Sequence, residues 1–124
     1  MIALDSFGWI ERFTDGPKAK RYNKIIDQQS SPEEILTSVV VMYEVYRKVK
    51  KLKGEQIALE NTAALMQTKV VPIDDTLALE AADFNLEYGL HFSDALVYAT
   101  ARRFDAVLYT SDEHFKKIPF VQYI

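Results

Sequence analysis

Four acidic residues occupy positions from which their side chains could share one site. Asp5 directly follows the apolar run MIAL, and Asp112 follows the run AVLYT after one intervening residue. Asp94 lies at the front of the alanine-rich segment HFSDALVYATARR, and Glu44 lies inside the apolar segment VVVMYEVYRKV. Carboxylates gathered in one cleft repel one another, so such a group is best explained by a divalent cation among them. Oxygen ligands without His or Cys favour Mg²⁺ or Mn²⁺, the ions of phosphate-ester chemistry.

Two of these acids also have an ordinary structural interpretation. Asp94 in a first helical turn faces the positive end of the helix dipole, which favours an acid there by about 0.3–1 kcal/mol. Glu44 could pair with Arg47 or Lys48, three and four residues further along the same helix, for about 0.2–0.5 kcal/mol. These segments alone leave both interpretations open. The decision depends on whether the elements that carry the acids meet in space.

The pattern along the chain predicts strands that alternate with helices. Short apolar runs predict strands at 1–4, 69–73, 106–110 and 120–124, and ILTSVVV begins β-branched before the sequence becomes helical. Further helices are expected over 7–13, with Ser6 as its cap, and over 18–29, 55–68, 74–88 and about 93–103. One face of the helix that Gly54 ends is apolar and comprises Val41, Val45, Val49 and Leu52. This alternation implies βαβ units and one α/β domain with a mostly parallel sheet.

The ends of the predicted strands would bring the acids together. In open α/β sheets, ligands bind outside the carboxyl ends of the strands. Asp5 and Asp112 each follow a strand, and Asp94 begins a helix that is entered from the loop after Gly89. We therefore expect these three at one edge of the sheet, where Glu44 could join them.

Composition limits the classes of function. With 124 residues, of which 48% are hydrophobic, the chain is long enough to bury a core. It contains no cysteine, which excludes disulfides and thiolate sites. His91 and His114 are too few for a zinc cage, so we expect structural or surface roles for them. No apolar run is long enough to span a membrane, and Met1 leads into Asp5 without room for a signal peptide, so a cytoplasmic location and no membrane partner are expected.

Net charge bears on whether the partner is a nucleic acid. The formal net charge is −3, which argues against an RNA or DNA partner. Without the four acids discussed above, however, fifteen basic residues stand against fourteen acidic ones. A nucleic-acid partner therefore stays open.

Four motifs in this chain resemble those of a PIN-domain ribonuclease, and most closely those of a VapC-like toxin of a toxin–antitoxin pair. They cover nearly the whole chain and are ALDSFGWIERF with Asp5, SVVVMYEVYRKV with Glu44, FSDALVYATAR with Asp94, and LYTSDEHF with Thr110 and Asp112. The resemblance implies a single PIN domain over residues 1–124, built as a three-layer α/β/α structure. Ser6 stands where such proteins often carry a pair of hydroxyl residues, and Glu113 beside Asp112 leaves the identity of the fourth acid open.

The resemblance implies a metal-dependent endoribonuclease that hydrolyses tRNA or another structured RNA and leaves a 5′-phosphate and a 3′-hydroxyl. Its catalytic and metal-binding residues would be Asp5, Glu44, Asp94 and Asp112. Asp5 and Asp94 are the candidates for direct Mg²⁺ or Mn²⁺ ligands, while Glu44 and Asp112 would act through water. Supporting hydrogen bonds would come from Ser6 and Thr110. Contacts to the RNA are expected from basic residues around the cleft: Lys18, Arg21, Arg47 and Lys48.

The same resemblance implies two protein partners. Such toxins usually form homodimers, and a cognate antitoxin covers the acidic cleft with a C-terminal segment. An apolar surface for that segment could come from Phe7, Trp9, Ile10 and Phe13, although these residues could equally belong to the core. An alternative function is a non-catalytic PIN-like module that binds RNA or protein without cleaving it.

Overall fold

A single sheet of parallel strands forms the centre of the molecule. The computed structural model describes residues 1–124. Its five strands lie in the order β3-β2-β1-β4-β5 and all pair in parallel, which confirms the predicted α/β class. Their bounds are Ile2–Leu4 for β1, Ile35–Ser38 for β2, Lys69–Val71 for β3, Val107–Thr110 for β4 and Val121–Tyr123 for β5. Because the strands run in parallel, the residues that follow β1 and the neighbouring β4 meet at the same edge of the sheet.

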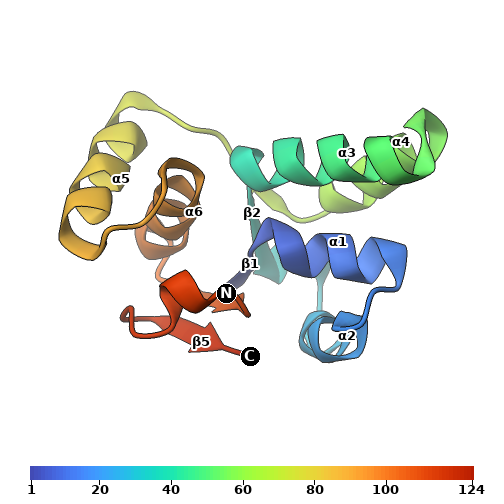
Figure 1. The fold of residues 1–124 in the computed structure, drawn as a ribbon, viewed down its shortest axis with the longest axis horizontal. Coiled ribbons are helices and arrows are strands. Elements are labelled where there is room, and N and C mark those ends of the chain that lie inside the picture. Colours follow the sequence, from blue (N-terminus) through green and yellow to red (C-terminus); the bar gives the residue numbers. More distant parts are fainter.

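Helices flank this sheet on both sides, as predicted (Figure 1). One group lies to the right of the strands in Figure 1 and consists of α1 (Ser6–Thr14), α2 (Ala19–Asp27), α3 (Val39–Lys53) and α4 (Glu55–Leu65). The other group, to the left, consists of α5 (Asp75–Tyr88) and α6 (Phe92–Arg103). Two 3₁₀ turns complete the chain: η1 (Pro32–Glu34) and η2 (Glu113–Phe115). None of the helices combines the length and the apolar character that crossing a membrane requires.

Helix α6 is the most deeply buried helix, and this fixes the start of the segment that carries Asp94. All seven residues from Ala95 to Ala101 are buried, so the helix is covered on every side. It contacts strands β2 and β4 and packs against α5 and α3. The alanines in this run allow its neighbours to approach closely. A helix enclosed in this way cannot turn about its axis without breaking the core, so its first turn is held in a fixed orientation.

Helix α3 buries most of the apolar face that the sequence predicts. Val41, Val45 and Val49 are fully buried. The expectation that Leu52 continues this face is wrong, because its side chain is 54% exposed. Leu52 lies in the last turn of α3, beside the turn at Gly54, where solvent reaches it. The buried valines set the rotation of α3 and thereby determine the direction in which Glu44 points.

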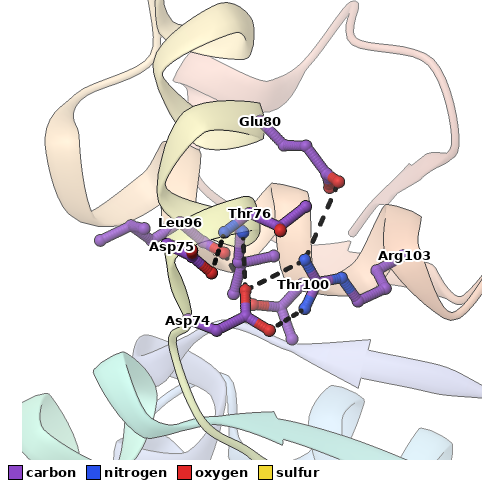
Figure 2. Close-up of polar contacts among 8 residues, drawn as sticks. Asp74, Asp75, Thr76, Glu80, Leu96, Thr100 and Arg103 are labelled. Carbon is purple, nitrogen blue, oxygen red and sulfur yellow. Dashed lines mark hydrogen bonds and ion pairs between the residues drawn. The ribbon is translucent and has the colours of Figure 1, made fainter.

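An ion pair joins the start of α5 to the end of α6 (Figure 2). Asp74 is the N-cap of α5 and accepts a hydrogen bond of 2.8 Å from the backbone N–H of Leu77. The two guanidinium nitrogens Nη1 and Nη2 of Arg103 lie 3.0 and 3.2 Å from the two oxygens of the same carboxylate. The hydrogen bonds from Arg103 and Leu77 hold the pKa of Asp74 below its usual value. The ion pair thereby holds the start of α5 against the end of α6, and Asp94 lies at the other end of α6.

Gly8 in α1 makes room for the aromatic ring of Tyr22, which is fully buried under the helix. A Cβ atom at position 8 would lie 2.4 and 2.5 Å from two carbons of that ring. Alanine is the better helix former by about 1 kcal/mol, but overpacking in a filled core costs about 1–3 kcal/mol. We therefore expect Gly8→Ala to lower the free energy of unfolding, measured by urea denaturation.

A double-mutant cycle identifies the cause of that loss. In a Tyr22→Leu background, the ring is gone, and Gly8→Ala should then be neutral or stabilising. An equal loss in both backgrounds would show that the contact with Tyr22 is not the reason.

Candidate functional site

Asp5 sits between the first strand and the first helix, and both of its carboxylate oxygens are engaged. It is the N-cap of α1, and its Oδ1 accepts a hydrogen bond of 2.9 Å from the backbone N–H of Gly8. Its Oδ2 accepts a short hydrogen bond from the hydroxyl of Thr110, at the end of β4. The expectation that Ser6 caps this helix is wrong, because the helix begins one residue earlier than predicted and the side chain of Asp5 accepts the capping hydrogen bond. Ser6 is instead the first helical residue, so its hydroxyl is free for another contact.

Thr110 connects Asp5 to the segment that contains Asp112. Its hydroxyl oxygen also accepts a hydrogen bond of 3.0 Å from the backbone N–H of Asp112. Asp112 then turns the chain into η2, and its carboxylate accepts a hydrogen bond of 2.9 Å from the backbone N–H of His114. Thr110 is fully buried. It therefore holds the two acids that follow the neighbouring strands β1 and β4 in a fixed relation.

The first turn of α6 brings Asp94 to the same place. Carboxylate oxygens of Asp94 and Asp112 and a ring nitrogen of His114 all lie within 4.8 Å of one another. An open cavity of about 280 Å³ is lined by Asp5, Asp94 and Asp112, together with Ser6, Phe7, Lys18 and Ser111. Three acids from separate parts of the chain thus face one hollow at the carboxyl edge of the sheet.

Glu44 reaches this edge from α3. A second open cavity of about 390 Å³ contains Glu44 and Ser6, along with Ile10, Tyr43, Arg47 and Lys48. Ser6 lines both cavities, so they adjoin. The ordinary interpretation of Glu44 as a partner of Arg47 or Lys48 is not observed, since neither side chain forms an ion pair with it. Glu44 therefore lies at the acidic cleft without a cation of its own helix to neutralise it.

The pKa values of three of these acids show that they influence one another. Burial raises the pKa of Asp5 to about 6, although the hydrogen bonds from Thr110 and Gly8 oppose this, and the charges of Asp112 and Asp94 raise it further. Burial also raises the pKa of Asp94, with added repulsion from Asp112 and Glu44. The pKa of Glu44 is raised by burial and by the charge of Asp5, while the Ser6 hydroxyl lowers it. The titrations of Asp5, Glu44 and Asp94 are therefore coupled to the charges around them.

Three residues near the acids are not among the candidates predicted from the sequence. Tyr22 is fully buried, its hydroxyl lies 2.9 Å from the hydroxyl of Ser111, and it accepts a hydrogen bond of 3.1 Å from the Ser111 backbone N–H. Burial and the nearby charge of Asp5 raise the pKa of Tyr22. His114 lies with its Nδ1 atom 2.9 Å from Asp112, although the sequence suggested only a structural or surface role. Its position two residues after Asp112 was the one signal that could have identified it.

The basic candidates divide into two groups. Arg47 and Lys48 line the cavity that contains Glu44, and Lys18 lines the one that contains the other three acids. The Lys18 ammonium also lies 5.9 Å from the centroid of the Phe7 ring. Arg21 is exposed on α2, and no ion pair or hydrogen bond connects its side chain to the acids. The structure thus places three of the four basic candidates at the cleft.

The sequence left open whether Asp112 or Glu113 is the fourth acid of the cleft. Glu113 lines a separate depression with Tyr88, Lys116 and Lys117, whereas Asp112 faces Asp94.

The apolar residues of α1 do not form one continuous surface, because Trp9 is only 4% exposed while Phe7 is 43% exposed. The Trp9 ring stacks on that of Phe13 at a centroid distance of 5.7 Å. Trp9 therefore belongs to the core.

Comparison with known proteins decides the family. The sequence profile of the PIN domain matches residues 2–121. This chain belongs to the PIN domain family. No curated protein matches the chain at a significant level.

Solved structures similar to this PIN domain come from toxin–antitoxin systems. A toxin–antitoxin complex from Klebsiella pneumoniae is 23% identical, with a TM-score of 0.84 and full coverage of both chains. VapC20 from Mycobacterium tuberculosis, a toxin that cleaves the sarcin–ricin loop, is 17% identical, with a TM-score of 0.80 over 98% of this chain and 97% of that one. VapBC2 from Rickettsia felis, bound to a promoter DNA fragment, is 18% identical, with a TM-score of 0.74 over 100% and 98%. At these identities the likeness shows the fold.

The donor set of this PIN domain fits a hard divalent cation. Asp5, Glu44, Asp94 and Asp112 supply carboxylate oxygens, the ligands that Mg²⁺ and Mn²⁺ prefer. No Lys or Arg forms an ion pair with any of the four. A cation held among them would offset their mutual repulsion.

The raised pKa of Asp5 predicts how stability depends on pH in the presence of a chelator. The unfolded chain loses this proton near pH 3.8, but the folded protein keeps it until about pH 6, so unfolding releases a proton between these values. The wild type should therefore lose stability as the pH rises through this window, on the order of 3 kcal/mol in total from Asp5.

Asp5→Asn removes this titration while its amide oxygen can still cap α1. We expect the variant to approach or exceed the wild type in free energy of unfolding above pH 6, and its advantage over the wild type to grow from pH 4 to pH 7. Asp94→Asn should change stability in the same direction. Urea denaturation in EDTA across this range measures both, and a difference between variant and wild type that does not vary with pH would contradict the crowding of the acids.

Proposed function

We propose that this PIN domain is a metal-dependent endoribonuclease that acts as the toxin of a toxin–antitoxin pair. The observation that carries the proposal is the convergence of Asp5, Glu44, Asp94 and Asp112 from four separate segments onto one edge of the sheet. A stable fold does not require four carboxylates to crowd together, and the raised pKa values of Asp5, Glu44 and Asp94 support a cost of this arrangement that a cation would offset. Phosphodiester hydrolysis is a reaction that benefits from such a cation.

Mg²⁺ or Mn²⁺ bound here would stabilise negative charge on the scissile phosphate and would make water a stronger nucleophile. Asp5 and Asp94 are the candidates for direct contact with the ion, because both line the cavity and burial raises the pKa of each. Glu44 lies on the adjoining side, next to Ser6, where it can orient a water molecule for attack. Attack forms a bond between the water oxygen and phosphorus and breaks the bond from phosphorus to O3′. The products are then a 5′-phosphate and a 3′-hydroxyl.

Each acid is held in place by a specific neighbour. Thr110 and Gly8 fix both oxygens of Asp5. Asp112 is held by Thr110 through its backbone N–H. The buried helix α6 fixes Asp94. Such prior organisation matters because an ion site loses affinity when its ligands must first be ordered.

RNA contacts are proposed along the exposed side of α3 and beside Phe7. Arg47 and Lys48 lie next to Glu44, and the side chain of Tyr43 in the same cavity is 67% exposed. Basic groups would contact phosphates, and an exposed aromatic ring can stack on an unpaired base. A structured RNA with a single-stranded segment, such as tRNA, fits this combination.

A cognate antitoxin and a second copy of the chain are the proposed protein partners. Similar solved structures include toxin–antitoxin complexes. An acidic cleft attracts the guanidinium of an arginine, and bidentate pairing adds geometric specificity. An antitoxin segment that places an arginine among these acids would exclude the cation. The site of action proposed for the toxin is the cytoplasm.

Cleavage of a mixed RNA pool tests the enzymatic proposal. The wild type should cleave RNA with Mg²⁺ or Mn²⁺ and lose this activity in EDTA. Asp5→Asn and Asp94→Asn should each lower the rate by at least about a hundredfold, because each removes charge from the ion site. Cleavage that persists unchanged in Asp5→Asn would rule out this site, and RNA binding without cleavage would favour the non-catalytic alternative.

A matched pair of variants tests which residue is the fourth acid. Asp112→Asn should lower the cleavage rate, whereas Glu113→Gln, which changes the adjacent residue outside the cavity, should stay within about twofold of the wild type. The opposite order would transfer the role to Glu113.

RNA binding by α3 is tested through its salt dependence, in an Asp5→Asn background that prevents cleavage. Each phosphate contact contributes about 0.7 to the slope of log K against log salt concentration for a single strand. Replacing Arg47 and Lys48 by Ala should therefore reduce the slope by about 1.4. The matched control replaces Lys51 and Lys53, which are exposed on the same helix outside the cavity, and should leave the slope unchanged. Equal slopes in both double variants would exclude contacts at Arg47 and Lys48.

A further inference from the structure

An imidazole lies against two of the carboxylates at the outer rim of the acidic cleft. His114 is in η2, and its Nδ1 atom lies 2.9 Å from the carboxylate of Asp112. Ligand atoms of Asp94, Asp112 and His114 are mutually within 4.8 Å. These residues come from the start of α6 and from the turn after β4, so the group is created by the fold and not by local sequence.

The second histidine supports the position of the first. The rings of His91 and His114 meet edge to face, at a centroid distance of 5.1 Å and an interplanar angle of 88°. His91 precedes α6 directly, and His114 lies in η2. The contact therefore joins the two segments that supply Asp94 and Asp112, and it limits the directions in which the His114 ring can point.

A nitrogen ligand changes which cations a site prefers. Carboxylates alone favour Mg²⁺ and Mn²⁺, while an imidazole shifts the preference toward later transition ions such as Co²⁺ and Zn²⁺. Ligand atoms around a zinc ion with bonds of about 2.0–2.1 Å lie roughly 3.4 Å apart. Atoms separated by up to 4.8 Å would therefore have to approach by up to about 1.4 Å, while His114 and Asp112, at 2.9 Å, are already close enough. The side chains of His114 and Asp112 are 64% and 38% exposed, which leaves them room for this movement.

We propose that His114, together with Asp94 and Asp112, binds a divalent transition-metal ion through an imidazole nitrogen. The imidazole gives this site a preference for later transition ions such as Co²⁺ and Zn²⁺ over Mg²⁺. The proposal rests on the proposed function insofar as Asp94 and Asp112 belong to both sites. The inference goes beyond the proposed function because it adds a nitrogen ligand and a class of cation that carboxylates alone do not select.

The test uses the full chain and measures the metal directly. EPR spectroscopy of bound Mn²⁺ should detect coupling to an imidazole nitrogen in the wild type, and this coupling should vanish in His114→Gln. Calorimetric titration should show that His114→Gln weakens Zn²⁺ and Mn²⁺ binding at least about tenfold, while Mg²⁺ binding changes less than about twofold. Asp94→Asn should weaken Zn²⁺ binding as well, because a carboxylate from α6 belongs to the site. Glu113→Gln is the matched control and should leave Zn²⁺ affinity unchanged.

Three results would overturn the assignment. The first is the absence of nitrogen coupling in the wild type. The second is coupling that survives in His114→Gln and disappears in His91→Gln. The third is Zn²⁺ binding that depends on His114 but not on Asp94, since that describes an isolated surface histidine.

Cleavage of RNA by the wild type in Mg²⁺ separates this inference from the proposed function. If the wild type cleaves RNA and its bound Mn²⁺ shows no nitrogen coupling, the inference fails and the nuclease proposal stands. If nitrogen coupling is present and no cation supports cleavage, the nuclease proposal fails and the metal site stands.

Discussion

Repulsion among carboxylates at the carboxyl edge of the sheet is the constraint on which the rest of this structure depends. Burial raises the pKa values of Asp5, Glu44 and Asp94, and this repulsion raises them further. The fold withstands this repulsion because rigid elements hold each acid. The hydrogen bond between Thr110 and Asp5 is central, since it joins the ends of β1 and β4. Pairing of these two strands therefore sets the distance between the first acid and Asp112.

The packing of helices α3 and α6 determines the direction in which Glu44 and Asp94 point. The rotation of α3 is set by Val41, Val45 and Val49, and that of α6 by the buried run from Ala95 to Ala101. Because both helices are anchored by apolar packing, Glu44 and Asp94 cannot turn away from the cleft to reduce their repulsion. Hydrophobic burial, a large and non-directional term, here supplies the free energy that keeps charged groups at close range.

The sequence predicted the fold class, because alternation of short apolar runs and amphipathic segments leaves few other arrangements. It also predicted which acids would approach one another, since residues after parallel strands meet at one edge. It placed the cap of α1 at Ser6 instead of Asp5, because both residue types are good caps and the two residues are adjacent. Tyr22 gave no signal, since its contact with Ser111 spans 89 residues. His114 gave little signal, because two histidines are too few for a zinc cage, whereas the fold places one of them beside carboxylates.

Three of the four acids lie at the start of a helix, where the helix dipole stabilises their negative charge. Glu44 lacks this stabilisation. Asp5 caps α1, Asp112 caps η2, and Asp94 lies in the first turn of α6. Backbone N–H groups at these helix starts favour a negative charge, which offsets part of the repulsion. Glu44 has no such compensation, because it lies inside α3, away from either end and without an ion pair. A half-buried carboxylate with a raised pKa and only the Ser6 hydroxyl to favour its charged form adds nothing to the stability of the helix. The position of Glu44 therefore supports the proposal that the cleft binds a cation.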